Sequence, residues 1–220
     1  MFNKFIKSHG TTYIFLSPWI ILYAIFGLFP LFYSVILSFT KTNMLNPKMK
    51  FIGISNYQHI IFNPEFWSAF KNTLIYAIGT IPFTISIAIV LAVLINEKIP
   101  FKALFRAGFF LPSVTAIIII ALIFKFLYAP HGVMNFMLTR LGFMPPDPSW
   151  LLNPKVALPA IMVMAVWSSF GYYMILFLAG LQNIPEELYE AAAMDGCNGF
   201  SKFVYIILPQ LKPIILLAVV

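Results

Sequence analysis

Four of the seven acidic residues of the 220-residue chain lie in one stretch between Ile184 and Pro213, namely Glu186, Glu187, Glu190 and Asp195. Pro185 suits the first position of a helix, and carboxylates in a first turn are favoured by the helix dipole. Three consecutive alanines follow, whose small side chains would let another protein approach closely. The stretch therefore predicts a short helix with a surface open to a partner. An ordinary loop resting on lipid headgroups is the alternative reading.

A second helix should follow a turn at Asp195 and Gly196, because glycine readily adopts the left-handed conformation that ends helices. Apolar residues then recur at helical spacing and form one stripe. They are Phe200, Phe203, Val204, Ile207, Leu208 and Leu211. Such a stripe suits the membrane interface. Pro209 is expected to break this helix before another apolar run begins near Pro213.

Hydroxyl and aromatic side chains gather in the sequence WSSFGYY, and they could bind a neutral solute rich in hydroxyl groups. They are Trp167, Ser168, Ser169, Tyr172 and Tyr173. No carboxylate occurs inside the four long apolar runs described below, which argues against proton coupling or a cation channel. We interpret WSSFGYY as a candidate solute path. Helix packing through small and hydroxyl-bearing residues is the alternative.

The sequence lacks the motifs that nucleotide binding, metal binding or a disulfide would require. The chain has no G-x-x-x-x-G-K-[ST] loop that would hold nucleotide phosphates. His9, His59 and His131 lie far apart in the sequence, and Cys197 is the single cysteine, so we expect neither a metal site nor a disulfide. We therefore expect a protein that is not an enzyme and that has no cofactor of its own.

The composition indicates a membrane protein, because 61% of the residues are hydrophobic and only 10% are charged. The basic residues that give the net charge of +7 are scattered, which does not favour nucleic-acid binding. Uncharged runs predict an all-α bundle with a terminal segment 1–10 and one membrane domain 11–220. The expected spans are 12–40, 72–95, 107–127, 156–183 and the start of a fifth at 213–220, with a loop at 184–212.

The eight residues of the fifth run are too short to cross a bilayer, so we expect the chain to stop inside a span. Lysines and arginines divide seven to seven between the two sides of this topology. The dense loop 97–106 favours an N-terminus inside the cell. Two further groups of aromatic residues are expected to anchor the chain at the interface. They are Phe62, Phe66, Trp67 and Phe70, and Trp150 in the sequence PPDPSW.

The loop also carries a family resemblance. Glu-Ala-Ala, then Gly, then Ile-x-Leu-Pro resembles the cytoplasmic signature loop of binding-protein-dependent ABC importer permeases. Here it falls on Glu190, Ala191, Ala192, Gly196, Ile206, Leu208 and Pro209. The flanking IPEELYEAA with Asp195, and FIGISNYQHIIFNPEFWSAFKNTLIY, FRAGFFLPSV and FLAGLQNIP elsewhere, are similar to the carbohydrate-type subfamily. Cys197 stands where the family often has alanine.

The resemblance implies a bundle of about six spans in the intact protein, with four complete here and a fifth begun. It implies that the loop docks on a cytoplasmic ABC ATPase dimer, which binds ATP and Mg. Glu190 would make charged contacts, Ala191 and Ala192 would allow close approach, and Gly196 would set the turn. A second, non-identical permease and an extracellular or periplasmic solute-binding protein would complete an importer in a bacterial-type inner membrane.

Two alternatives stay open from the sequence. A permease of the same type could carry another solute, such as an amino acid, a polyamine or a peptide. Its charged contacts would then lie outside the visible spans. A membrane scaffold without transport activity would need no ATPase at all.

Overall fold

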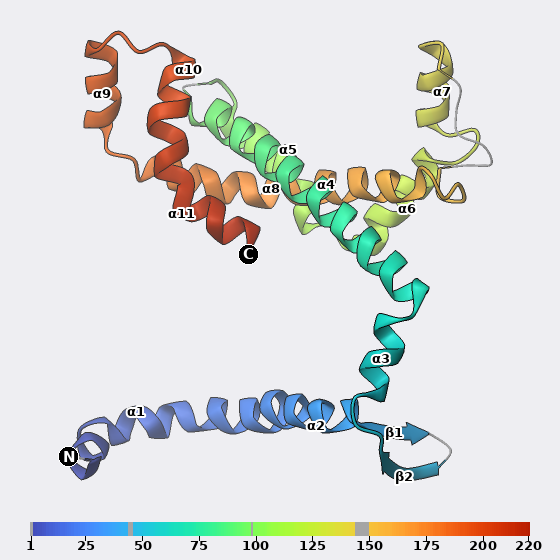
Figure 1. Cartoon of the computed structure of the whole chain (residues 1–220). Coiled ribbons are helices and arrows are strands. Elements are labelled where there is room, and N and C mark those ends of the chain that lie inside the picture. Colours follow the sequence, from blue (N-terminus) through green and yellow to red (C-terminus); the bar gives the residue numbers. More distant parts are fainter. Residues whose placement is uncertain (1, 44–45, 98, 144–149) are drawn as a thin grey trace. The chain divides into compact units, whose positions relative to one another are not determined.

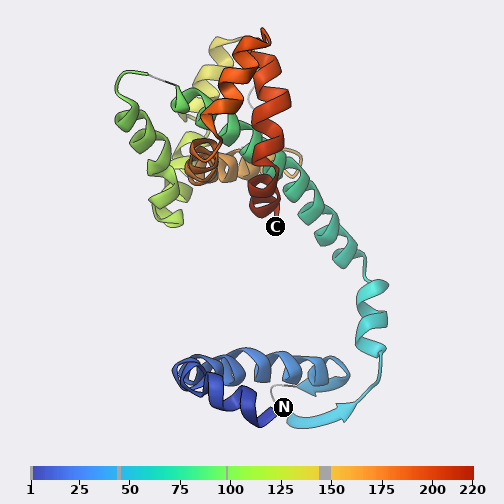
Figure 2. The ribbon, with the colours of Figure 1, turned by 90° about the vertical axis from the view of Figure 1, so that its left-hand side faces the viewer.

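The computed structural model describes residues 2–43, 46–97, 99–143 and 150–220, and only the backbone of residues 2–11, 42–43 and 46–48. Lys98, which entered the charge balance, and most of PPDPSW lie outside these residues. The chain divides into two units, Met1–Phe70 and Lys71–Val220, and each is described by itself. Helices dominate both units (Figures 1 and 2), which confirms the predicted all-α membrane fold.

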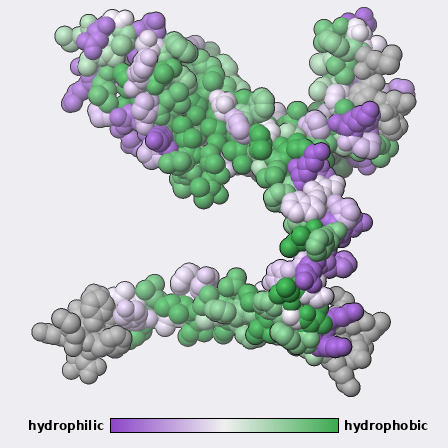
Figure 3. All heavy atoms as spheres, viewed as in Figure 1, coloured by the Kyte–Doolittle hydropathy of each residue, from purple (hydrophilic) through white to green (hydrophobic). Residues whose placement is uncertain are grey.

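The first unit begins with one long helical rod made of α1 (Phe2–Tyr23), a π-turn (Ala24–Leu28) and α2 (Phe29–Ser38). Thr12–Ser38 is apolar and long enough to span a bilayer, with none of it buried in the unit. Figure 3 shows the coloured part of this rod as largely hydrophobic. The wide π-turn directly precedes α2, whose first turn holds Pro30. A π-turn relaxes the backbone ladder where proline lacks its N–H.

A small hairpin and a short helix follow the rod. The strands β1 (Thr40–Asn43) and β2 (Asn46–Phe51) pair antiparallel, with Thr40 opposite Phe51 and a register shift between Lys41 and Asn43. The helix α3 (Ser55–Ile61) comes next. The sequence reading did not predict this hairpin, since its strands are short and rich in lysine rather than in alternating apolar residues.

The second unit takes most of α4 (Pro64–Asn96), a helix that starts in the first unit. The helices after it are α5 (Lys102–Val114), α6 (Ile117–Leu127), α7 (Val133–Arg140), α8 (Ala157–Gln182), α9 (Glu186–Met194), α10 (Gly199–Lys202), a π-turn (Phe203–Ile207) and α11 (Leu208–Val219). The α10–α11 helix crosses α8 at an angle in both views of the ribbon (Figures 1 and 2).

The core of this unit lies where α4, α8 and α11 meet. It contains Ala88, Ala92 and Ile95 of α4, Met174, Phe177, Leu178 and Leu181 of α8, and Ile207 and Leu211. The two alanines are fully buried and bring the helix backbones together. A Cβ at Gly180 would lie 2.1 Å from Cδ1 of Ile214. Small residues of this kind permit the close helix packing on which membrane bundles depend.

The third expected span, 107–127, is not one straight helix. The structure has α5 and α6 bent by 96° at a short break. Thr115 and Ala116 adopt extended backbone with ψ of 137° and 132°, directly after Pro112 in the last turn of α5. Hydropathy alone cannot detect such a bend, since both halves are apolar.

The expected break at Pro209 is wrong. One helical segment runs from Gly199 to Val219 and is long and apolar enough to span a bilayer. The Leu208 N–H bonds to the Phe203 carbonyl in a π-turn, so Pro209 enters the first turn of α11 without ending the helix. The loop 184–212 therefore contains the beginning of this span.

Candidate functional site

The predicted surface helix is present as α9, and most of its expected contact residues face outward. Glu190, Ala191 and Asp195 are exposed, as are Glu186 and Glu187. Ala192 is buried, with 5% of its surface accessible. The helix therefore presents an acidic, alanine-containing surface on one side and packs against the chain on the other.

Gly196 ends α9 as expected, with φ of +71°. Its N–H bonds to the Ala193 carbonyl at 3.2 Å, and the Cys197 N–H reaches back to the Ala192 carbonyl at 2.9 Å. These two bonds form a Schellman motif, which satisfies carbonyls at the helix end. The turn is therefore built into the backbone and needs no partner to form.

Asn198 fixes the start of the next helix, a role that the sequence reading missed. Its side-chain oxygen accepts a hydrogen bond from the Ser201 N–H at 2.8 Å, which is the usual geometry of a helix N-cap. The signal was visible, since asparagine precedes this helix by one residue. Together with Gly196, it sets the direction in which the chain leaves α9.

The stripe on the second helix packs inward, contrary to the expected position at the membrane interface. Ile207 and Leu211 are buried in the core, with Phe203 packed against it, whereas Phe200 is 77% exposed. Ile206 and Leu208 are half-buried and Pro209 is exposed. The stripe thus fastens this helix to α8.

Tyr189 fastens α9 to the same core. Its ring packs against the cluster together with Ile99 and Ile184. Its hydroxyl oxygen is buried and has no hydrogen-bond partner among the described residues. Burial raises the pKa of the Tyr189 hydroxyl above its ordinary value of 10.0, and the nearby Glu97 carboxylate raises it further.

This contact also shows how the chain crosses between α4 and α9. Glu97 and Ile99 follow α4 directly. Ile99 packs against the same core as Tyr189, and the Glu97 charge acts on the Tyr189 hydroxyl, so both segments occupy the same end of the unit (Figure 1). An even number of crossings must separate them. With α8 as one crossing, this arrangement favours a broken span over a re-entrant loop for the bent α5–α6 pair.

A small pocket of about 130 Å³ lies among α4, α8 and α11. The hydroxyl-bearing residues that line it are Tyr76, Thr80, Thr84, Ser169 and Tyr173. Two of them come from WSSFGYY. The three on α4 were missed, although their spacing of four residues places them on one helix face. The Thr80 hydroxyl donates to the Tyr76 carbonyl at 2.7 Å.

The rest of WSSFGYY is divided among other environments. Trp167 lines an apolar groove of about 450 Å³ between α4 and α8, and its ring contacts Phe124 edge to face. The Ser168 hydroxyl donates to the Ala165 carbonyl of its own helix at 3.0 Å. Tyr172 is 57% exposed, and its ring meets that of Tyr173. The structure therefore brings together Ser169 and Tyr173 but not all five residues.

The helices α5 and α8 approach one another closely beside this site. A Cβ at Gly171 would lie 2.0 Å from the Phe109 carbonyl oxygen, so only glycine fits there. The Ser113 hydroxyl oxygen accepts a hydrogen bond from the Tyr172 N–H at 3.0 Å. This crossing holds the helix that carries Ser169 and Tyr173 in place.

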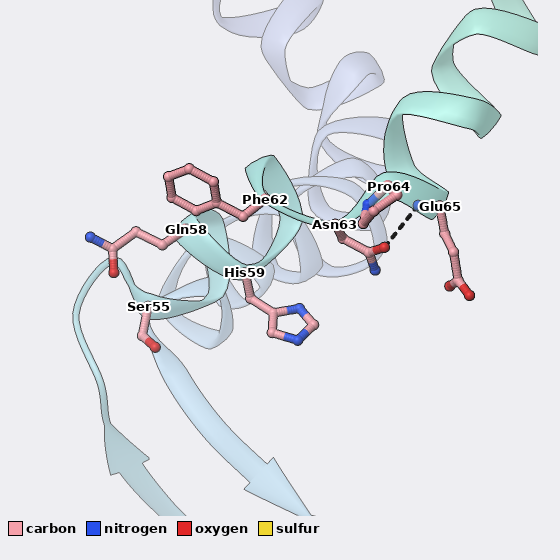
Figure 4. Close-up of a pocket in the computed structure, with 7 residues that line it drawn as sticks. All are labelled: Ser55, Gln58, His59, Phe62, Asn63, Pro64 and Glu65. Atoms are coloured by element: carbon pink, nitrogen blue, oxygen red, sulfur yellow. Dashed lines mark hydrogen bonds between the residues drawn. The ribbon is translucent and has the colours of Figure 1, made fainter.

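An open hollow of about 770 Å³ lies in the first unit at the start of α4 (Figure 4). It is lined by Ser55, Gln58, His59, Phe62, Asn63, Pro64 and Glu65. Asn63 caps α4 by accepting the Glu65 N–H at 2.8 Å. Next to it, Phe66, Trp67 and Phe70 contact one another and are 40–52% exposed. Their role as interface anchors stays a prediction.

Trp150 does not stand free as an anchor. Its indole N–H donates to the side-chain oxygen of Asn135 at 2.7 Å, and its ring stacks on Tyr128 at 5.3 Å. The Tyr128 hydroxyl donates to the Ala160 carbonyl at 3.0 Å. Trp150 therefore ties the loop before α8 to α6 and α7.

Comparison with known proteins places these features in a family. Residues 75–220 match the family described as binding-protein-dependent transport system inner membrane component. The arabinooligosaccharides transport system permease protein AraP of Bacillus subtilis (strain 168) is 35% identical over 215 residues, which are 96% of this chain and 67% of the relative. The lactose transport system permease protein LacF of Rhizobium radiobacter is 35% identical over 206 residues, 93% of this chain and 68% of the relative.

A solved structure supports the same assignment. The crystal structure of a bacterial ABC transporter involved in the import of the acidic polysaccharide alginate aligns with a TM-score of 0.82 and 27% identity. The alignment covers 98% of this chain and 73% of the matched chain. The chain therefore belongs to the family of inner-membrane components of binding-protein-dependent transport systems.

Proposed function

We propose that this chain is a membrane-spanning permease subunit of an ATP-driven ABC importer and that its solute is a sugar or a related polyol. The observation that carries the solute class is the carbohydrate named for its relatives, arabinooligosaccharides and lactose. The pocket among α4, α8 and α11 supports it, because its polar groups are hydroxyls without charge. Hydroxyl groups can donate and accept hydrogen bonds and therefore suit a sugar.

The pocket also supports a moving path rather than a fixed binding site. Its volume of about 130 Å³ is well below the roughly 300–1,000 Å³ of ordinary ligand pockets. A sugar can pass only if α4 and α8 separate. Alternating access by rocking of helix bundles supplies such a motion.

The drive for this motion is assigned to a separate ATPase that binds ATP and Mg. The exposed face of α9, with Glu190 and Ala191, is the proposed docking surface for it. Tyr189 on the buried face would pass the movement of α9 to the end of α4. The sequence contains no phosphate-binding loop of its own, in agreement with this division of roles.

Further partners complete the proposed importer. They are a second, non-identical permease subunit and a solute-binding protein on the outer side. A related alginate transporter is described in complex with a pentasaccharide-bound periplasmic protein. The N-terminus and α9 would then both face the cytoplasm, since the crossings between them are the rod, α4, the bent pair and α8.

Uptake by the reconstituted importer tests this function. Liposomes that contain the full complex and internal ATP should accumulate a labelled neutral oligosaccharide when its binding protein is added. They should not accumulate a labelled amino acid or polyamine under the same conditions. Accumulation of the charged solutes instead would overturn the sugar assignment.

Substitution at the docking surface tests the coupling separately. Glu190→Gln should reduce ATP-driven uptake and weaken recovery of the ATPase with the permease. Glu65→Gln, which neutralises an exposed acid in the first turn of α4, should change neither. Normal uptake and normal ATPase recovery in Glu190→Gln would contradict the role of α9.

A further inference from the structure

The β1–β2 hairpin sets two lysines directly opposite each other. Lys41 pairs with Lys50 in the antiparallel register, and both side chains are exposed. Opposite side chains in such a pair lie about 5 Å apart at their Cβ atoms, and like charges there destabilise the pairing. A two-stranded hairpin is only marginally stable by itself. A nearby anion would offset this repulsion.

The surrounding chain does not supply that anion. Residues 1–64 contain neither aspartate nor glutamate, and Glu65 is the one acid of the first unit. The same 64 residues contain a third hairpin lysine, Lys48. The positive charge of the hairpin is thus left for a group outside this unit to neutralise.

On its opposite face, the strand β2 carries apolar residues. Side chains alternate between the two faces of a strand, so Met49 and Phe51 point away from the face of Lys50. Their side chains are 50% and 75% exposed. One thin element thus combines a basic face and an apolar face, the combination with which peptides lie in a membrane interface.

Hydrogen bonds hold the hairpin to the end of a membrane span. The span ends at Ser38, whose carbonyl accepts a bond from the Asn56 side-chain amide at 2.9 Å. The same amide donates to the Thr40 carbonyl at 3.1 Å, and the Tyr57 hydroxyl donates to the Ser38 hydroxyl at 2.7 Å. The hairpin therefore stays close to the level at which hydrocarbon gives way to headgroups.

We propose that this hairpin is a binding site for anionic phospholipids in the leaflet where α2 ends. Lys41 and Lys50 bind the phosphate groups, while Met49 and Phe51 enter the apolar side of the interface. Long lysine side chains reach phosphates in this way from a partly immersed backbone. A lipid fits better than an acidic protein, since the apolar face and the adjacent span both point to the bilayer.

Hydrogen exchange of the amides of residues 40–51 tests the proposal in the intact complex. The complex is placed in nanodiscs of phosphatidylcholine alone or of phosphatidylcholine with phosphatidylglycerol. Each lysine near an anionic surface contributes about 1 kcal/mol, so two should increase protection about 30-fold in the anionic discs. The gain should shrink at high salt, because salt screens exposed charges.

Three variants make the outcome specific. The double variant Lys41→Gln, Lys50→Gln should lose the lipid-dependent gain in exchange protection. In neutral discs its hairpin should be better protected than that of the wild type, because the substitutions remove only the repulsion between the two lysines. Lys41→Arg with Lys50→Arg should keep the gain, and Lys155→Gln, outside the hairpin, should behave as wild type. A gain that persists in the double glutamine variant would overturn the proposal. So would protection that depends on the solute-binding protein instead of the lipid. The hydrogen-exchange measurement does not require transport, so its result is independent of the proposed function.

Discussion

Tyr189 combines two properties that normally exclude each other, a buried hydroxyl and no hydrogen-bond partner among the described residues. A buried polar group left unsatisfied costs about 1–3 kcal/mol. The ring itself packs against the core and links α9 to the segment after α4. In this conformation the ring of Tyr189 therefore stabilises the fold, whereas its unsatisfied hydroxyl destabilises it.

Separating the ring from the hydroxyl gives a prediction for stability. Tyr189→Phe should leave the complex as stable as wild type or raise its unfolding midpoint, because it removes only the unsatisfied group. Tyr189→Ala should destabilise it, by less than the roughly 3–5 kcal/mol of a fully buried aromatic residue, because the ring is only partly buried. Thermal unfolding of the purified complex measures both. Equal losses in the two variants would show that the hydroxyl has a partner.

The hydroxyl pocket makes a second prediction for single residues. Ser169→Ala and Tyr173→Phe should each raise the KM for sugar uptake about two- to tenfold, since a hydrogen bond contributes about 0.5–1.5 kcal/mol. Ser168→Ala is the matched control, because its hydroxyl is already bonded to Ala165. Uptake kinetics in proteoliposomes distinguish them. A larger effect at Ser168 than at Ser169 would contradict the path.

At the scale of elements, the crossing of α5 and α8 depends on one glycine. Gly171→Ala would push a methyl group against the Phe109 carbonyl, and the backbone would have to move, at a cost of about 1–3 kcal/mol. Gly108→Ala in α5 meets no atom within 4 Å and should be neutral or stabilising. Comparing the unfolding midpoints of the two variants checks this. Similar midpoints would mean that the crossing is looser than the structure shows.

The elements that sequence reading predicted best are those specified by local signals. Pro185, the acidic first turn and Gly196 determine α9 within a few residues, and the structure places that helix at Glu186–Met194. The bend at Thr115 and the continuous helix through Pro209 escaped prediction, because packing and a π-turn decide whether a proline interrupts a helix. The hydroxyl-bearing residues that α4 contributes to the pocket could have been predicted, because they recur every four residues in the sequence.

At the scale of the molecule, the packing of two distant segments against one core bears on the topology. Ile99 and Tyr189 pack against the same core, so we expect an even number of crossings between α4 and α9, which favours a broken span for the bent α5–α6 pair. The charge count could not establish this, since it was tied. In the proposed topology with the N-terminus inside, α9 would face the proposed ATPase and α7 would lie on the outer side.

Labelling from one side of the membrane tests this topology and the whole account most directly. Cys197 is the single cysteine, so Cys197→Ala gives a background for Asp195→Cys after α9 and Met137→Cys in α7, both at exposed positions. An impermeant maleimide added to intact cells should label position 137 and should reach position 195 only after permeabilisation. Labelling of position 195 in intact cells would place α9 outside, where no cytoplasmic ATPase can bind it.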